Sequence, residues 1–117
     1  MSTSKETAAF IEDQLAGLDI RTGRMFGEYA IYCDNKVVGF ITDDILRIKP
    51  SSVDPALLEG TYPGEAYPGS KLYASVPGDL LENREWLQQA IQATADALPA
   101  PLPKRDSGRG KPGGGGV

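Results

Sequence analysis

The residue types that most often do chemistry are scarce in this sequence. There is no histidine and a single cysteine, Cys33, so catalysis would depend on Asp, Glu, Lys, Tyr or that thiol. The carboxylates Asp43 and Asp44 are adjacent. Neighbouring side chains in a turn point apart, so this pair closes neither a metal site nor an acid/base dyad without distant partners. Aspartate is common in turns, and we interpret the pair as a turn.

Cys33 offers no second route to catalysis. No residue beside it in sequence supplies a base that would lower the pKa of its thiol. A lone cysteine also gives neither an intramolecular disulfide nor a zinc cluster. No G-x-G-x-x-G, P-loop or G-x-S-x-G motif is present. The sequence therefore predicts a protein that is not an enzyme and that uses no metal or cofactor.

Aromatic and basic residues of the predicted strands are better candidates for a site. Side chains alternate along a strand, so Tyr29 should share one face with Cys33 while Tyr32 lies on the other. Helices cover one face of a two-layer fold, which leaves the other face to solvent or to a partner. Tyr and Arg are enriched at protein interfaces, and the predicted binding residues are Arg24, Tyr29, Tyr32, Arg47 and Lys49. The alternative is an ordinary solvated sheet face.

Charge divides the chain into two parts. Residues 1–98 carry 8 Lys and Arg and 15 Asp and Glu, a net of 8 − 15 = −7, whereas residues 99–117 carry four basic residues and Asp106, a net of 4 − 1 = +3. An acidic body disfavours nucleic-acid binding. The Pro- and Gly-rich tail is predicted to be disordered. It is interpreted as a solubilising terminus or as a weak electrostatic arm of Lys104, Arg105, Arg109 and Lys111.

The organisation is that of one small domain. With 117 residues and 40% hydrophobic residues, the chain suits a single core over residues 1–98, followed by the tail of residues 99–117. No basic and then apolar leader is evident, and no apolar run approaches 18 residues. We expect a cytoplasmic protein with no membrane contact.

The hydrophobic pattern predicts helices at both ends of the body. Thr3 is the expected cap of a first helix that ends near Gly17. The last helix should follow "VPGD" (residues 76–79), with its strongest pattern from Asn83 onward, and Pro99 should stop it. Between them, Asp54 and Pro55 indicate a short helix.

Strands fill the remaining segments. Three short β-rich runs, separated by Asp34–Asn35 and Asp43–Asp44, predict an antiparallel meander over residues 28–50. Two further strands should flank a type II turn at Pro68–Gly69. The order is α-βββ-α-ββ-α, and the predicted fold is α+β with two layers, helices on one antiparallel sheet. Gly27 is expected where the chain enters the first strand with unusual φ, with Met25 and Phe26 anchored in the core.

Two segments carry a family resemblance. "RMFGEYAIYCDNKVVGFITDDILRIKP" and "YASVPGDLLENREWLQQAI" resemble the N-terminal domain of the TfoX (Sxy) competence regulators, in its stand-alone form. The matching positions are Arg24, Met25, Phe26, Gly27, Tyr29, Tyr32, Asp43, Asp44, Lys49, Tyr73, Val76 and Pro77. The sequence departs from the family pattern at Glu28, Ala30 and Arg47. The resemblance implies a fold similar to secretion chaperones and a transcriptional co-regulator that works beside the cyclic-AMP receptor protein without an enzymatic step.

Three functions stay open at this point. The first is a regulatory module that binds a protein partner, either a transcription factor or a second copy of itself in a homodimer. The second is a nucleic-acid accessory protein that uses the basic tail. The third is a sensor of a small ligand.

Overall fold

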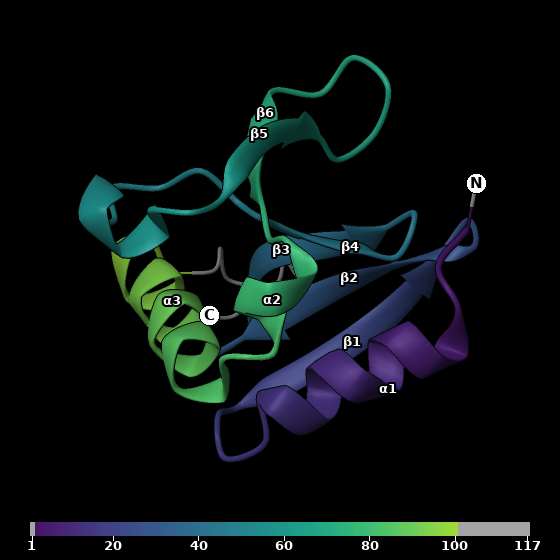
Figure 1. The fold of residues 1–117 in the computed structure, drawn as a ribbon, viewed down its shortest axis with the longest axis horizontal. Helices are drawn as coiled ribbons and strands as arrows, with labels where there is room; N and C mark the ends of the chain where they lie inside the picture. The colour runs from purple at the N-terminus through teal and green to yellow at the C-terminus, as the bar shows by residue number, and fades with distance from the viewer. Residues whose placement is uncertain (1, 101–117) are drawn as a thin grey trace, which may run out of the picture.

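The structure, a computed structural model, describes residues 2–100. Within them lies one six-stranded sheet in the order β1-β2-β3-β4-β6-β5, in which all neighbouring strands are antiparallel. The elements, in chain order, are α1 (Lys5–Gln14), β1 (Ile20–Met25), β2 (Glu28–Cys33), β3 (Lys36–Thr42), β4 (Ile45–Ile48), η1 (Pro55–Leu58), β5 (Tyr62–Glu65), β6 (Leu72–Ser75), α2 (Gly78–Leu81) and α3 (Arg84–Ala97). Figure 1 shows this arrangement. The predicted α+β class is confirmed.

Four strands precede η1, where the pattern indicated three. The additional strand, β1, pairs with β2 along its whole length, from Ile20 opposite Cys33 to Met25 opposite Glu28. Its sequence, IRTGRM, lacks the alternating apolar pattern because β1 lies at the edge of the sheet and is largely exposed. An edge strand forms through its hydrogen bonds to one neighbour, which hydrophobic periodicity does not reveal.

Three tight hairpins order the first four strands. Each connection has two residues, and both have positive φ, as in a type I′ turn. The φ values are Phe26 53°, Gly27 81°, Asp34 55°, Asn35 65°, Asp43 53° and Asp44 62°. Asp and Asn tolerate this region well, so the two turns that these residues mark are confirmed. The same geometry at Phe26 is costly for a bulky side chain.

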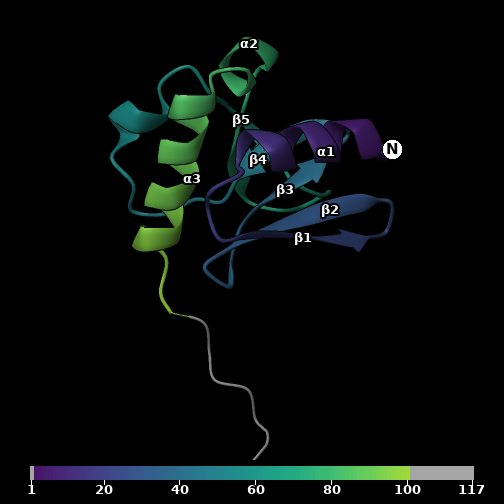
Figure 2. The ribbon, with the colours of Figure 1, turned by 90° about the horizontal axis from the view of Figure 1, so that it is seen from below.

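The helices cover one face of the sheet. Tyr29 is directly opposite Ile41, so the two point to the same face, and Ile31, two residues along β2, points the same way. Ile31 and Ile41 lie on the face that contacts the helices, and both are fully buried. They belong to one hydrophobic cluster with Ile11 of α1 and with Leu87 and Ile91 of α3. Figure 2 shows α1 lying over β1 and β2. We call the opposite side, which no described helix covers, the open face.

Some helix boundaries differ from the prediction. The cap of α1 is Ser4, whose side chain accepts a hydrogen bond from the Thr7 amide, and the helix ends at Gln14 rather than near Gly17. The second predicted helix is a single 3-10 turn, η1, begun by Asp54. The predicted last helix is divided into α2 and α3, because the Asn83 side chain caps a new helix by accepting from the Trp86 amide at 3.1 Å.

The β5–β6 hairpin completes the sheet and bends away from it. It joins β4 through two residue pairs, Arg47 opposite Ser75 and Ile48 opposite Ala74. Figure 1 shows its far end rising clear of β3 and β4. The predicted turn at Pro68–Gly69 is confirmed, because the Ser70 amide donates to the Tyr67 carbonyl at 2.9 Å and Gly69 has φ 85°. Among residues 2–100, no helix is both long and apolar enough to cross a membrane.

Candidate functional site

The predicted site residues do not form one site. Tyr29 is buried on the helix-covered face, where the guanidinium carbon of its strand neighbour Arg24 lies 5.8 Å from its ring centroid. Tyr32 lies on the open face, and the guanidinium carbon of Arg21 lies 3.9 Å from its ring centroid. The sheet separates the two tyrosines, as the alternation along β2 predicted, so they do not belong to a common site. The sequence reasoning also missed Arg21, which pairs with Tyr32 across the strands.

Two further predicted groups lie elsewhere. Lys49 follows β4 and lines a shallow hollow with Leu98 and Pro99 at the end of α3. Its amide donates to the Val38 carbonyl at 2.8 Å. The tail residues Lys104, Arg105, Arg109 and Lys111 lie outside the described residues.

Arg47 is the predicted residue that does reach a concave surface. Its Nε donates to the Thr42 hydroxyl at 3.1 Å and its Nη1 to the Ser75 hydroxyl at 2.7 Å. The guanidinium lies against Gly64 of β5, where an added Cβ would overlap Nη1. A guanidinium carries five N–H donors. These two bonds fix its plane between β3 and β6 and leave other donors for a ligand.

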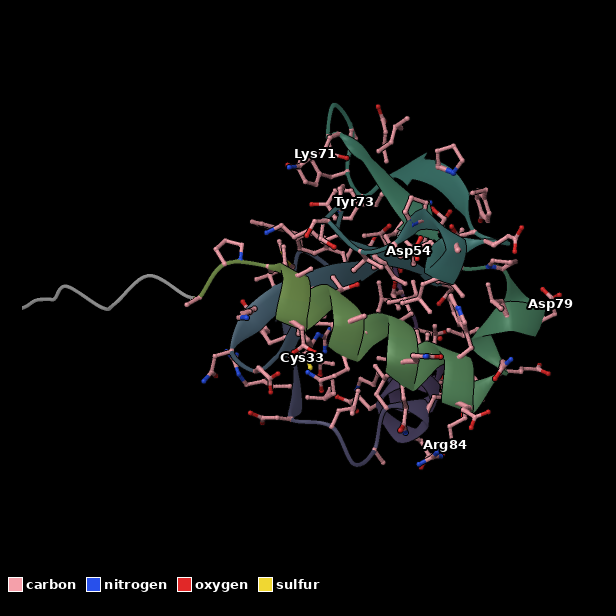
Figure 3. All side chains as sticks on the ribbon, turned by 90° about the vertical axis from the view of Figure 1, so that its left-hand side faces the viewer. Cys33, Asp54, Lys71, Tyr73, Asp79 and Arg84 are labelled. Atoms are coloured by element: carbon pink, nitrogen blue, oxygen red, sulfur yellow. The ribbon has the colours of Figure 1, made fainter. Side chains whose placement is uncertain are left out.

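The concave surface has an apolar half. A pocket of about 340 Å³ opens on the open face between the β1–β2 turn and the loop after β5. Its lining residues are Met25, Phe26, Glu28, Phe40, Thr42, Ala66 and Tyr67. The ring of Phe40 lies 5.8 Å from that of Tyr73, at a tilt of 52°, which supports the floor. Figure 3 shows Tyr73 on the β5–β6 hairpin.

The polar half adjoins it. A second hollow of about 410 Å³ shares Glu28, Thr42, Ala66 and Tyr67 with the first and adds Asp43, Arg47, Glu65 and Pro68. Its charged residues sum to one positive and three negative, a net of 1 − 3 = −2. We call the two hollows together the open-face groove. Such a surface suits a ligand with an apolar part beside a positive charge.

Phe26 stands at the mouth of this groove. Its side chain is 97% exposed, and Met25 is 41% exposed, so the prediction that both anchor in the core is wrong. The reason is the type I′ turn, which projects its first central residue away from the sheet. Gly27 does have the predicted unusual backbone, with φ 81°.

A hydrogen-bond network holds the wall of the groove. The Thr3 hydroxyl lies 2.7 Å from Oε1 of Glu28 and 3.0 Å from the Ile41 carbonyl, and it accepts from the Asp44 amide at 3.2 Å. Oε1 of Glu28 also accepts from the Asp43 amide at 3.1 Å. The Ser4 amide donates to Asp44, and this bond, together with the Thr7 hydroxyl, lowers the pKa of the Asp44 carboxyl. The N-terminal segment thus ties two hairpin turns together.

Cys33 lies on the other face, beneath α3, as Figure 3 shows. Burial, followed by the negative charge of Asp34, raises the pKa of its thiol to about 11. The thiol is therefore protonated at neutral pH. In residues 2–100 no group of three or more His, Cys, Asp and Glu side chains is arranged to hold a metal ion.

Sequence reasoning missed the apolar half of the groove. Phe40 and Tyr67 are separated by 26 intervening residues in sequence, and they come together because β6 pairs with β4. A usable signal was present at Phe26–Gly27. A large aromatic residue before glycine, at a two-residue connection, indicates an exposed side chain rather than a core anchor.

Comparison with known proteins gives a family match and a curated relative. The model of the TfoX N-terminal domain matches residues 13–98. The chain is also 43% identical over 106 residues to the "Uncharacterized 12.7 kDa protein in trpE 5'region" of Spirochaeta aurantia, which covers 90% of this chain and 91% of that protein. No solved structure gave a match.

Proposed function

Because the chain belongs to the family of the TfoX N-terminal domain, we propose that it is a non-enzymatic regulatory module that binds a segment of a partner protein in the open-face groove. The family resemblance supports a transcription factor as that partner, in competence or a related transcriptional response in the cytoplasm. The groove combines an apolar pocket with a charged rim, the composition of a peptide-binding surface.

The observation that carries this proposal is the conformation of Phe26. A non-glycine residue in the left-handed region costs roughly 1–2 kcal/mol, and here that conformation holds a 97% exposed aromatic ring beside an apolar pocket. Backbone strain of this kind concentrates at functional sites. Aromatic residues at the centre of an interface contribute a large share of its binding energy. Phe26 is therefore the proposed anchor of the complex.

The absence of a catalytic step is part of the proposal. Its support is the state of the one thiol, since the pKa of Cys33 is raised to about 11 and a protonated thiol is a poor nucleophile.

Capture of partners from a lysate of the source cells tests the function. Wild-type protein and Phe26→Asn are compared with Phe10→Asn, which changes another exposed phenylalanine, on α1. We expect mass spectrometry to identify a protein that wild type and Phe10→Asn retain and Phe26→Asn loses. Equal capture by wild type and both variants, or equal loss in the two variants, would contradict a role for the groove.

A second candidate, a sensor of a small apolar ligand, is favoured by the pocket volume. About 340 Å³ lies within the roughly 300–1,000 Å³ typical of small-molecule sites. Native mass spectrometry of the purified protein distinguishes the two functions. A bound small molecule that Phe10→Asn retains and Phe26→Asn lacks would favour the sensor.

A further inference from the structure

We propose that the open-face groove receives residues 99–105, Pro-Ala-Pro-Leu-Pro-Lys-Arg, from a second copy of this chain. This inference rests on the proposed function and names a partner segment for the same groove. The two copies would exchange these segments reciprocally, in a closed dimer with two-fold symmetry.

The spacing of the segment fits the groove. Proline-rich segments bind aromatic-lined grooves as a polyproline II helix, which has three residues per turn and rises about 3.1 Å per residue. Leu102 and Arg105 would then lie on one side of the segment, about 9 Å apart. In the groove, Phe40 belongs to the apolar half and Asp43 to the polar half. They are three residues apart, along the end of β3 and into the turn that follows it, which is at most about 10 Å.

The charges are complementary. The polar half of the groove has a net charge of −2, as summed above, and Lys104 and Arg105 give the segment two positive charges. The net charge of residues 1–98 is −7 and that of residues 99–117 is +3, as counted above. Attraction between the two parts therefore favours the encounter and aligns the basic end of the segment with Glu65 and Asp43.

The length of the chain assigns the segment to a second copy rather than to the same molecule. The Leu98 carbonyl lies 3.1 Å from Nζ of Lys36, at the start of β3. The groove residue of β3 nearest to Lys36 is Phe40, about 13 Å along the strand, and its side chain lies on the opposite face of the sheet from the helices. From Leu98 to Leu102 the chain spans at most about 14 Å. A path from the helix-covered face, where Leu98 packs, around the end of the sheet to the open face at Phe40 is longer than this span.

Paramagnetic relaxation measured between two copies tests the inference. Two samples are mixed. One chain, at natural isotope abundance, carries a nitroxide at Ser107→Cys, and the other chain is ¹⁵N-labelled and carries no nitroxide. Cys33 is buried, and mass spectrometry checks that the Ser107→Cys chain carries one nitroxide and not two. In the mixture we expect broadening of the Thr42 and Ala66 amides and none at Gln88 of α3. Absence of broadening at the groove would overturn the proposal.

A matched pair of variants separates recognition of the segment from general attraction. Arg105→Glu and Lys111→Glu make the same change in charge, but only Arg105 lies in residues 99–105. We expect Arg105→Glu in the spin-labelled chain to weaken the association about fivefold, as for loss of one favourable ion pair, and Lys111→Glu to leave it nearly unchanged. Equal effects of the two variants would show attraction without a docked segment and would overturn the proposal.

Failure of this inference can be told apart from failure of the proposed function. If Phe26→Asn loses the captured partner while the mixed sample shows no broadening, the groove binds another protein and this inference alone fails. If the broadening is seen while capture is independent of Phe26, the exchange of segments stands and the regulatory function fails.

Discussion

The guanidinium of Arg47 and the backbone of Gly64 fit against each other, two strands apart, on the open face. Arg47 extends from β4 across β6, donates to Ser75 and ends at the position where any other residue at 64 would place its Cβ. That Cβ would lie 2.7 Å from Oγ of Ser75 as well. Glycine at position 64 is therefore a condition for the shape of the polar half of the groove.

We expect Gly64→Ala to lower the free energy of unfolding by about 1–3 kcal/mol, as overpacking does, and to displace Arg47. The matched control is Gly23→Ala in β1, where an added Cβ would meet Tyr32 at an ordinary 3.7 Å. Its stability should be unchanged or higher by up to about 1 kcal/mol. Urea denaturation measures both. Equal stability of the two variants would mean that Arg47 does not occupy this position.

Replacement of Phe26 by asparagine should raise stability while it weakens partner binding. Asparagine tolerates positive φ, so relief of the strain at 53° should increase the free energy of unfolding by about 1 kcal/mol. Thermal denaturation measures this change. The control Phe10→Asn lies on α1, where no such strain is relieved and no gain is expected. A loss of stability in Phe26→Asn would show that the ring packs on the groove instead of serving a partner.

Thr3→Val should destabilise the link between the N-terminus and the two hairpin turns. Thr3 is 7% exposed. Valine removes the hydroxyl that bonds the Asp44 amide, the Ile41 carbonyl and Glu28. Loss of a buried hydrogen-bond partner costs about 1–3 kcal/mol. Thr61→Val, at a half-buried hydroxyl that bonds the Leu58 carbonyl, should cost less because water replaces the lost bond. The prediction fails if the two variants unfold at the same urea concentration.

Cys33 should make stability fall at alkaline pH. Its thiol pKa is about 11 in the folded protein against 9.0 normally. Between these values the native state holds the proton while the unfolded state has released it, so rising pH favours unfolding. The stability difference between wild type and Cys33→Ala should therefore be constant below pH 9 and should shift against wild type as the pH approaches 11.

Thiol titration provides an independent check on Cys33. Native protein at pH 8 should react slowly with a thiol reagent, and protein in urea should react fully, because burial shields the thiol and keeps it protonated. Rapid reaction of the native protein would show that the thiol is accessible, contrary to its burial beneath α3.

Local signals in the sequence were sufficient for much of the fold. The turns at Asp34–Asn35, Asp43–Asp44 and Pro68–Gly69 follow from residues that tolerate or require their backbone angles. The helical pattern from Asn83 onward and its end before Pro99 follow from 3.6-residue periodicity and from the missing amide hydrogen of proline. These features depend on neighbours within a few residues, so a single sequence is enough to predict them.

The site depended on contacts that no local pattern contains. Alternation along β2 correctly placed Tyr29 and Tyr32 on opposite faces, but which face the helices cover is decided by the packing of α1 and α3. The groove forms because β6 pairs with β4 and brings Ala66 and Tyr67 beside Phe40, a long-range pairing. The sequence by itself determined most of the elements and the three turns named above. Only the tertiary structure decided which side chains meet, because strand pairing and helix docking join residues that are distant along the chain.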